Sequence, residues 1–314
     1  MKQMDYRDFG ETGLKVSEIG MGCGWPNYAP DVDMVAYLRR AFDLGVNFYD
    51  TADMYWSGES ERLLGEAFAS KREEVIIATK FGTVIDDQGW HKDFGVEYMH
   101  RALEGSLRRL QTDYVDVYLL HSPLPPILDD EELLAALHKL KEEGRVRFFG
   151  ISLDGVDFCT EAIERWQPDV IQITFNLFNL DVTRAFPMIT EAEVGLIAKS
   201  PLDSGMLSGE LSADAPFKEG YDPRQRWGEE STKKRQEYME QLRSILEKPD
   251  RNWPQAALQF VLSFDAVSTA IVGTTNIKHL EENIEGAERR LSQGELEKIR
   301  SLLGGEFAKL NLGW

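Results

Sequence analysis

Short apolar runs alternate along this chain with longer stretches in which apolar residues recur at helical spacing. The runs are rich in Val, Ile and Phe and mostly lack polar alternation, which is typical of strands buried on both faces. They cover residues 17–23, 47–52, 75–81, 116–122, 148–153, 170–175, 195–202 and 268–273. The intervening stretches, such as residues 99–110, gather their apolar side chains on one helical face. The pattern predicts parallel strands joined by helices.

Eight such units in roughly 300 residues favour a closed (β/α)8 barrel, the TIM barrel, over an open sheet. An open sheet that binds a dinucleotide usually carries the glycine pattern G-x-G-x-x-G between a strand and a helix. Gly20, Gly22 and Gly24 come close to that pattern, but Trp25 stands where the third glycine belongs. We therefore expect an α/β fold in which one barrel domain spans residues 1–314.

Two additions to the barrel are predicted. Residues 5–20 hold two short strand-like pieces on either side of a turn from Gly10 to Gly13, which predicts an N-terminal β-hairpin across one end of the barrel. Residues 203–253 form a long polar insertion after the seventh strand, with a charged, helix-like run from Glu229 to Lys248. Connections of this length are usually functional or disordered.

Composition narrows the classes of partner. The chain has 35 Lys and Arg against 54 Asp and Glu, a formal net charge of −19, and it lacks basic runs. Such a charge repels nucleic acids and anionic membranes, so neither is expected as a partner. No apolar stretch reaches the roughly 18 residues of a membrane span, and the N-terminus lacks the apolar core of a secretion signal. Two cysteines suffice neither for a disulfide framework nor for a structural zinc site. We expect a cytoplasmic protein without a metal.

Polar residues interrupt three consecutive predicted strands near their carboxyl ends, the working face of such barrels. Asp50 closes the second strand, Lys80 ends the run VIIATK on the third, and His121 ends VDVYLLH on the fourth. Tyr55 follows Asp50 by five residues. Taken singly, each could be a helix cap, a packing residue or a hydrogen-bonded core residue. Adjacent strands lie about 4.8 Å apart, so the four side chains could instead converge on one pocket.

Such a cluster suits proton transfer to a carbonyl oxygen. A free tyrosine has a pKa of about 10, and we expect the Lys80 ammonium to lower that of Tyr55 while Asp50 holds the lysine. His121 would supply a further hydrogen bond to an oxygen that gains negative charge. Since no nucleophilic Ser or Cys motif and no metal-ligand spacing accompanies the cluster, the natural attacking group is a hydride from a nicotinamide.

These residues lie in segments that resemble the aldo-keto reductase family. DTADMY at 50–55, GESE at 58–61 and LG at 64–65 resemble its first signature. LLHSP at 119–123 resembles the second, and IATK at 77–80 carries the family's lysine. The resemblance covers nearly the whole chain and implies NAD(P)H-dependent reduction of an aldehyde or ketone. It also implies a catalytic tetrad of Asp50, Tyr55, Lys80 and His121.

The resemblance further implies the nucleotide contacts. Ser152 and Gln172 match residues that hydrogen-bond the nicotinamide carboxamide, and Phe175 stands where an aromatic ring stacks on the nicotinamide. Residues 200–205 resemble the loop around the pyrophosphate, and residues 273–283 include the helix start and the adenine contacts. The full set of expected contacts is Gly22, Cys23, Ser152, Gln172, Phe175, Ser200, Pro201, Leu202, Ser204, Gly205, Leu207, Gly273, Thr274, Thr275, His279, Glu282 and Asn283.

Two positions depart from the family pattern. Leu153 replaces the asparagine that usually follows the serine after the fifth strand, so one amide contact is lost or made otherwise. Family members that prefer NADPH usually place Lys or Arg beside the 2′-phosphate. At those positions this chain offers Gly273, Thr275 and His279, with Lys278 as the nearby cation. The family habit still favours NADP(H), with NAD(H) possible.

The sequence says less about the substrate. Trp25, Trp56 and Trp90 are candidate pocket walls, and an aromatic, weakly charged lining would suit a neutral small-molecule carbonyl compound. The oligomeric state is left open. Two other classes compete with a reductase: a nucleotide-binding subunit of the same fold that regulates a partner with little turnover, and a barrel that acts on phosphorylated sugars without nicotinamide.

Overall fold

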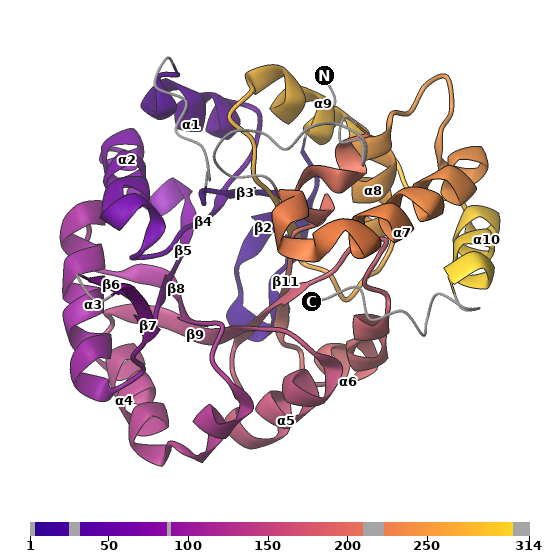
Figure 1. The fold of residues 1–314 in the computed structure, drawn as a ribbon. Coiled ribbons are helices and arrows are strands. Elements are labelled where there is room, and N and C mark those ends of the chain that lie inside the picture. The colour runs from indigo at the N-terminus through magenta and orange to yellow at the C-terminus, as the bar shows by residue number, and fades with distance from the viewer. Residues whose placement is uncertain (1–3, 25–31, 87–88, 210–222, 304–314) are drawn as a thin grey trace.

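The computed structural model describes residues 4–24, 32–86, 89–209 and 223–303. Eight parallel strands form its centre: β3 (Ile19–Gly22), β4 (Phe48–Asp50), β5 (Ile76–Phe81), β8 (Val115–His121), β9 (Val146–Leu153), β10 (Val170–Thr174), β11 (Gly195–Lys199) and β12 (Thr269–Val272). They pair in that order, and β9 pairs with β10 and β12 with β3, so the barrel is closed (Figure 1). Each predicted strand contains or overlaps one of these strands, and the predicted (β/α)8 fold is confirmed.

Helices surround the barrel, as Figure 1 shows. They are α1 (Met34–Asp43), α2 (Glu59–Phe68), α3 (Val96–Leu110), α4 (Glu131–Glu142), α5 (Val156–Trp166), α6 (Phe186–Glu191), α7 (Pro223–Leu246), α8 (Trp253–Leu262), α9 (Ile277–Ala287) and α10 (Gln293–Leu303). Several begin at a side chain that accepts a hydrogen bond from a free backbone N–H of the first turn. Asp33 caps α1, Asp130 caps α4, and Asn252 caps α8 in a reciprocal capping box with Gln255.

The predicted N-terminal hairpin is present. Its strands β1 (Tyr6–Asp8) and β2 (Lys15–Ser17) pair antiparallel. Phe9, between them, is fully buried and packs edge-to-face on Phe48 inside the barrel, with 5.6 Å between the ring centroids. It also lies against Gly195, the first residue of β11. The hairpin therefore closes the end of the barrel where the strands begin, which leaves the opposite end for a site.

The connections at that opposite end carry the additions. A second, unpredicted hairpin of β6 (Thr83–Asp86) and β7 (Gly89–Lys92) follows β5. After β11, the predicted insertion contains a 3-10 helix at Asp203–Ser208 and then α7. Gly228 in α7 has φ 74°, outside the helical region, and the predicted helical run starts directly after it.

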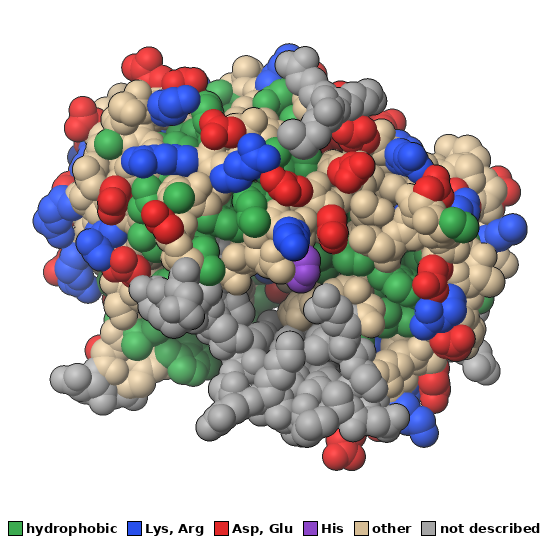
Figure 2. Space-filling model, turned by 90° about the horizontal axis from the view of Figure 1, so that it is seen from above, with side chains coloured by type: hydrophobic (Ala, Val, Ile, Leu, Met, Phe, Trp, Pro, Cys, Tyr) green, Lys and Arg blue, Asp and Glu red, His purple; other side chains and the backbone are tan. Residues whose placement is uncertain are grey.

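The described surface mixes both signs of charge. On the face shown in Figure 2, acidic and basic side chains lie interspersed. Some of the exposed charges form ion pairs between helices. Arg40 Nη2 of α1, for example, lies 2.6 Å from Glu281 Oε1 of α9. Within the described residues, no helix combines the length and the hydropathy that a membrane span requires.

Candidate active site

Three of the four predicted catalytic residues lie at the carboxyl ends of neighbouring barrel strands. Asp50 ends β4, His121 ends β8, and Lys80 is the residue before the end of β5. The Lys80 ammonium lies 2.6 Å from Asp50 Oδ2 and donates to the Thr51 carbonyl at 2.8 Å. Burial tends to lower the pKa of Lys80, but Asp50 and Tyr55 outweigh it and raise that pKa. The lysine is therefore a buried cation held by its partners.

Tyr55 begins a short 3-10 helix, Tyr55–Gly58, that follows β4. The Lys80 Nζ lies 5.2 Å from the centroid of the Tyr55 ring, so its charge acts on the phenol. The rings of Tyr55 and His121 are nearly perpendicular, with centroids 5.7 Å apart. Burial raises the pKa of Tyr55 above its ordinary value, and Lys80 opposes this rise. The lysine acts in the direction expected from the sequence, but its effect is smaller than that of burial, so the phenol stays protonated at neutral pH.

His121 is a neutral histidine. Burial holds its pKa well below the usual range, and the positive charges of Lys80, Lys92 and Lys199 add to this effect. Its Nδ1 is buried and makes no hydrogen bond with the residues that the structure describes. A neutral imidazole has one N–H, which it can donate to a carbonyl oxygen without exchanging a proton.

A cavity of about 450 Å³ joins the tetrad to the expected nucleotide contacts. Asp50, Tyr55 and His121 line it, and Lys80 is buried beneath them against Asp50. The predicted nucleotide contacts that line the same cavity are Gly22, Ser152, Gln172, Ser200, Pro201, Leu202, Ser204, Gly205 and Gly273. They come from the ends of five strands, β3, β9, β10, β11 and β12, or from the segments that follow. The cavity volume lies within the range of small-molecule sites, so the cavity has room for a nicotinamide ring and a small carbonyl compound.

Two of these side chains already have partners inside the protein. Gln172 Nε2 donates to Asp50 Oδ1 at 2.7 Å, so the glutamine is tied to the tetrad. Ser152 Oγ accepts from Lys199 Nζ at 3.3 Å. A carboxamide that binds here would compete with these bonds.

Lys199 lines the cavity and was not predicted. It ends β11, as His121 ends β8. The sequence repeats itself at these two strand ends, HSPL at 121–124 and KSPL at 199–202. In both copies the serine has φ 53°, a left-handed conformation that is uncommon outside glycine. This local repeat was the sequence signal that could have identified the lysine.

Several predicted contacts lie away from the cavity. Phe175 is a core residue rather than a stacking ring, because it is fully buried among Phe186, Phe260 and Phe264. Cys23 is likewise buried, and burial holds the pKa of its thiol well above the ordinary value. Leu207, a residue of the 3-10 helix, is fully buried.

The three predicted tryptophans are scattered. Trp25 lies outside the described residues. Trp56 follows Tyr55, is partly buried against the core, and has φ 54°. Trp90 lies on β7 with 73% of its surface exposed, and it does not line the cavity. The aromatic wall expected from the sequence is therefore not assembled by the described side chains.

The segment after β12, predicted from the sequence to bind phosphate, leads to α9. Thr274 Oγ1 accepts the Asn276 N–H at 3.1 Å, and Asn276 in turn caps α9. Thr275 is partly exposed at the start of this helix. His279, Glu282 and Asn283 lie along α9, the first two exposed and Asn283 buried. These positions are separate from the cavity that holds the tetrad.

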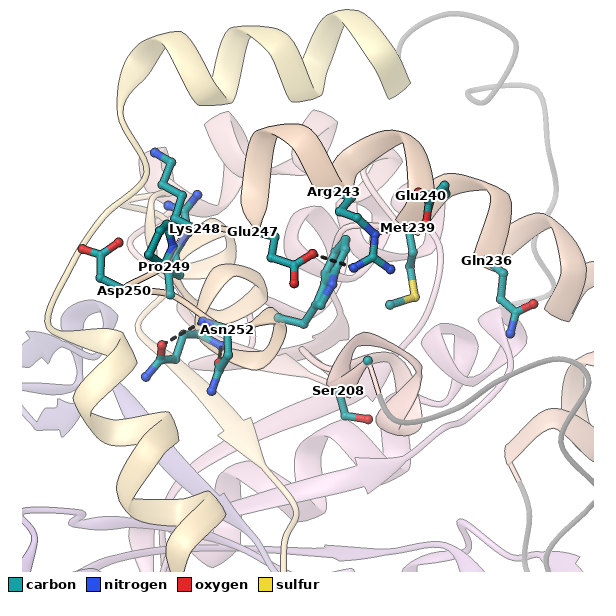
Figure 3. Close-up of a pocket in the computed structure, with 14 residues that line it drawn as sticks. Ser208, Gln236, Met239, Glu240, Arg243, Glu247, Lys248, Pro249, Asp250 and Asn252 are labelled. Atoms are coloured by element: carbon teal, nitrogen blue, oxygen red, sulfur yellow. Dashed lines mark hydrogen bonds and ion pairs between the residues drawn. The ribbon is translucent and has the colours of Figure 1, made fainter.

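A larger cavity of about 790 Å³ lies between α7 and the start of α8, away from the tetrad (Figure 3). Its two lining arginines are paired: Arg243 Nη1 lies 2.5 Å from Glu247 Oε2 in the lining, and Arg251 Nη2 lies 2.8 Å from Oε1 of Glu295 on α10. None of the four catalytic candidates lines it, so the smaller cavity is the candidate active site. In the described part of the chain, His, Cys, Asp and Glu form no group placed to hold a metal ion.

Comparison with known proteins identifies the family of the chain. A family model described as the Aldo/keto reductase family matches residues 18–303. The uncharacterized oxidoreductase YqkF of Bacillus subtilis is 32% identical over 305 residues, which cover 95% of this chain and 96% of that protein. Aldo-keto reductase yakc, named with NADP(+), of Schizosaccharomyces pombe is 29% identical and covers 91% of this chain and 88% of its own. The holo form of aldo-keto reductase AKR11C1 from Bacillus halodurans superposes with a TM-score of 0.79 at 31% identity and covers 96% of each chain.

Proposed function

The chain belongs to the aldo/keto reductase family, a family of oxidoreductases, and from this premise we propose that it reduces an aldehyde or ketone with a nicotinamide nucleotide and with Tyr55 as the general acid. The observation that carries the proposal is the shared cavity. Asp50, Tyr55 and His121 line it together with nine of the expected nucleotide contacts. Carbonyl reduction requires a hydride donor and a proton donor next to the same carbonyl group, so both must lie in one cavity.

Ser152 and Gln172 would hold the nicotinamide amide, and residues 200–205 with Gly273 would surround the phosphates. A reduced nicotinamide held there would supply the hydride that the carbonyl carbon needs. The carbonyl π bond then breaks toward oxygen, and this oxygen takes the proton of the Tyr55 hydroxyl. The result is an alcohol and a tyrosinate, which regains its proton from water.

The other residues of the tetrad act on that proton. The raised pKa of Tyr55 keeps its hydroxyl protonated before transfer. The Lys80 ammonium stabilises the tyrosinate afterwards, and Asp50 keeps the ammonium in place at 2.6 Å. Neutral His121 donates a hydrogen bond to the oxygen as negative charge develops on it. Because its pKa lies well below neutrality, His121 is not the proton source at neutral pH.

We propose NADP(H) as the preferred nucleotide, with NAD(H) as the weaker one. The name of the relative yakc, which includes NADP(+), supports this choice. The Thr274–Thr275 turn at the start of α9 offers hydroxyl and N–H donors for a 2′-phosphate. Paired fluorescence titrations with NADPH and NADH test the preference. We expect NADPH to bind at least about tenfold more tightly, which is the contribution of one charge-assisted hydrogen bond to the 2′-phosphate. Equal affinities would overturn it.

The function itself is tested by NADPH oxidation across a panel of aldehydes and ketones, with Tyr55→Phe as the matched variant. The substitution removes only the hydroxyl that gives the proton. We expect turnover to fall by about two or more orders of magnitude while nucleotide affinity is retained. Full activity in Tyr55→Phe would remove this residue from the mechanism. Tight nucleotide binding without turnover on any carbonyl would instead favour a regulatory subunit.

A further inference from the structure

The turn that carries Tyr55 has an unfavourable backbone. The two residues after Tyr55, Trp56 and Ser57, both have φ 54°, and Gly58 follows with φ 87°. Left-handed conformations are uncommon for residues other than glycine, and two such residues in a row persist only where the surrounding structure holds them. The orientation of the proposed general acid therefore depends on the contacts that keep this turn in place.

An arginine side chain lies directly against this turn. Arg109, near the end of α3, packs so closely on Gly58 that a Cβ at this glycine would collide with the arginine side chain. The same guanidinium lies against Gly105, one helical turn earlier on α3. Because both positions are glycine, the arginine has room between the turn and the helix.

A buried carboxylate fixes Arg109 in this position. Arg109 Nε lies 2.7 Å from Glu61 Oε2, and the Glu61 side chain is fully buried. The other oxygen, Glu61 Oε1, accepts a hydrogen bond from Thr79 Oγ1 at 2.5 Å. Thr79 lies on β5 directly before Lys80. A continuous series of contacts thus joins the strand that carries the lysine to the turn that carries the tyrosine.

Free space borders the turn on the side of α3. A cavity of about 220 Å³ lies there, and Met54, Ser57 and Arg109 are among the residues that line it. A strained backbone next to a cavity can relax into it when a neighbouring contact is lost. Since Arg109 contacts both the turn and the cavity, its loss would let the turn move.

We infer that Glu61 and Arg109 are positioning residues for Tyr55, and that their ion pair holds the turn so that the phenol faces Lys80 and the active-site cavity. The inference rests on the function proposed above and extends the residues that it needs beyond the tetrad. Neither Glu61 nor Arg109 lines the active-site cavity, so they act through Tyr55 and not on substrate or nucleotide. A misplacement of about 1 Å can reduce an enzymatic rate about a hundredfold.

Arg109→Lys is the first test. Lysine keeps a positive charge beside Glu61 but lacks the planar guanidinium that packs against Gly58. We expect kcat for a carbonyl substrate to fall by about tenfold to a hundredfold, while the affinity for NADPH stays within about twofold. Steady-state kinetics and a fluorescence titration measure the two quantities, and thermal unfolding shows that the variant is folded at the assay temperature.

Gly58→Ala disturbs the same turn from its other side. The added methyl group presses on Arg109, and alanine disfavours φ 87°. We expect the same pattern as for Arg109→Lys, a lower kcat with NADPH affinity retained. If Arg109→Lys does not fold, Gly58→Ala takes its place in every comparison.

The decisive measurement repeats Arg109→Lys in the Tyr55→Phe background. A residue that acts through the tyrosine hydroxyl has no further effect once this hydroxyl is absent, so the residual kcat should fall by less than about twofold. A merely structural role would lower the active fraction equally in both backgrounds. An equal loss of kcat in the two backgrounds would therefore overturn the inference.

Arg72→Lys is the matched control. Arg72 Nη2 lies 2.7 Å from Oδ2 of the buried Asp116, and the arginine side chain is 12% exposed. This pair lies where β5 and β8 begin, at the opposite end of the barrel from Tyr55. Arg72→Lys should lower the unfolding temperature and leave the kcat of the folded protein unchanged.

The outcomes separate this inference from the proposed function. A large loss of turnover in Tyr55→Phe, together with a kcat unchanged in Arg109→Lys and Gly58→Ala, would leave the reductase and overturn the positioning role. Full activity in Tyr55→Phe would overturn the proposed role of Tyr55 and the positioning role with it.

Discussion

Lys80 is kept charged by its surroundings and in turn acts on the pKa of Tyr55. Its own charge is maintained by Asp50 at 2.6 Å, although burial works against it. The same charge moderates the rise that burial produces in the pKa of Tyr55. The lysine thus sets how tightly the phenol holds its proton: tightly enough to be protonated at neutral pH, but less tightly than a buried tyrosine without a neighbouring cation.

The pH dependence of Lys80→Met follows from these signs. Reduction needs protonated Tyr55, so kcat/KM falls as pH rises through the pKa of the phenol. Removal of the positive charge takes away the influence that lowers this pKa, and the falling limb should move to higher pH. We expect the rate at neutral pH to fall by about two or more orders of magnitude as well, because the tyrosinate loses its counter-charge.

A pH profile of kcat/KM from neutral to alkaline pH measures the shift. Lys139→Met, whose lysine lies on the outer helix α4, is the control for loss of a lysine far from the cavity. If the limb stays where it is in Lys80→Met, the lysine does not tune Tyr55.

At the scale of single residues, the sequence predicted that Asp50, Tyr55, Lys80 and His121 lie close together, and it missed their neighbours for a physical reason. Asp50, Lys80 and His121 lie at or near the carboxyl ends of consecutive parallel strands. Because these strand ends meet at one end of the barrel, the sequence alone predicts that the three side chains lie close together. Phe175 also follows a strand, but its ring packs outward among other aromatics because the core between β10 and α8 needs filling. Lys199 was missed because its placement depends on contacts with Ser152 of β9 and with Asp154, which directly follows that strand.

At the scale of elements, the eight barrel strands were predictable because each is a short, mostly apolar and largely buried run. The hairpin of β6 and β7 was not, since its strands are short and largely exposed and so lack an apolar signal. The insertion was predicted as a polar, partly helical segment, but a sequence does not reveal what such a helix packs against. In the structure, α7 contacts the 3-10 helix of the proposed phosphate loop.

One buried ion pair makes this contact. Arg235 of α7 and Asp203 of the 3-10 helix are both fully buried, and Arg235 Nε lies 2.8 Å from Asp203 Oδ2. Asp203 has φ 49° and the next residue, Ser204, has φ 51°, so the loop holds a backbone that is unfavourable for residues other than glycine. The pair therefore links the position of α7 to the shape of the proposed phosphate loop.

Arg235→Met should destabilise the protein by about 3–5 kcal/mol, since it removes a charged partner of the buried Asp203 carboxylate. The substitution should also weaken NADPH binding, because the proposed phosphate loop at Asp203 loses the ion pair that links it to α7. Urea unfolding and a fluorescence titration measure the two effects. Arg243→Met is the matched control on the same helix, where the arginine is 49% exposed and its ion pairs are worth at most about 1 kcal/mol.

An unchanged NADPH affinity in folded Arg235→Met would contradict the second effect. It would show that the proposed phosphate loop keeps its shape without the Arg235–Asp203 ion pair. An equal loss of stability in Arg243→Met would show that burial of the Arg235–Asp203 pair has no special weight.

At the scale of the whole molecule, two electrostatic effects oppose each other. The formal net charge of −19 produces self-repulsion in the folded state, and added salt relieves it. Salt also weakens the ion pairs on the surface, such as Arg40–Glu281, whose side chains are 43% and 38% exposed. Each exposed pair contributes at most about 1 kcal/mol, while the repulsion acts between all the unpaired carboxylates at once. The buried pairs, such as Asp50–Lys80, are screened little.

We therefore expect salt to stabilise this protein. Thermal unfolding in about 10 mM and about 500 mM NaCl changes the Debye length from about 30 Å to below about 8 Å, so the long-range repulsion is removed while contacts inside the fold persist. The unfolding temperature should rise by a few degrees, which corresponds to about 1 kcal/mol for a chain of this size. The same concentrations of NaCl applied to a protein of similar size and near-zero net charge give the baseline. A fall in the unfolding temperature would mean that the exposed ion pairs outweigh the repulsion, and that the acidic excess is spread too thinly to oppose folding.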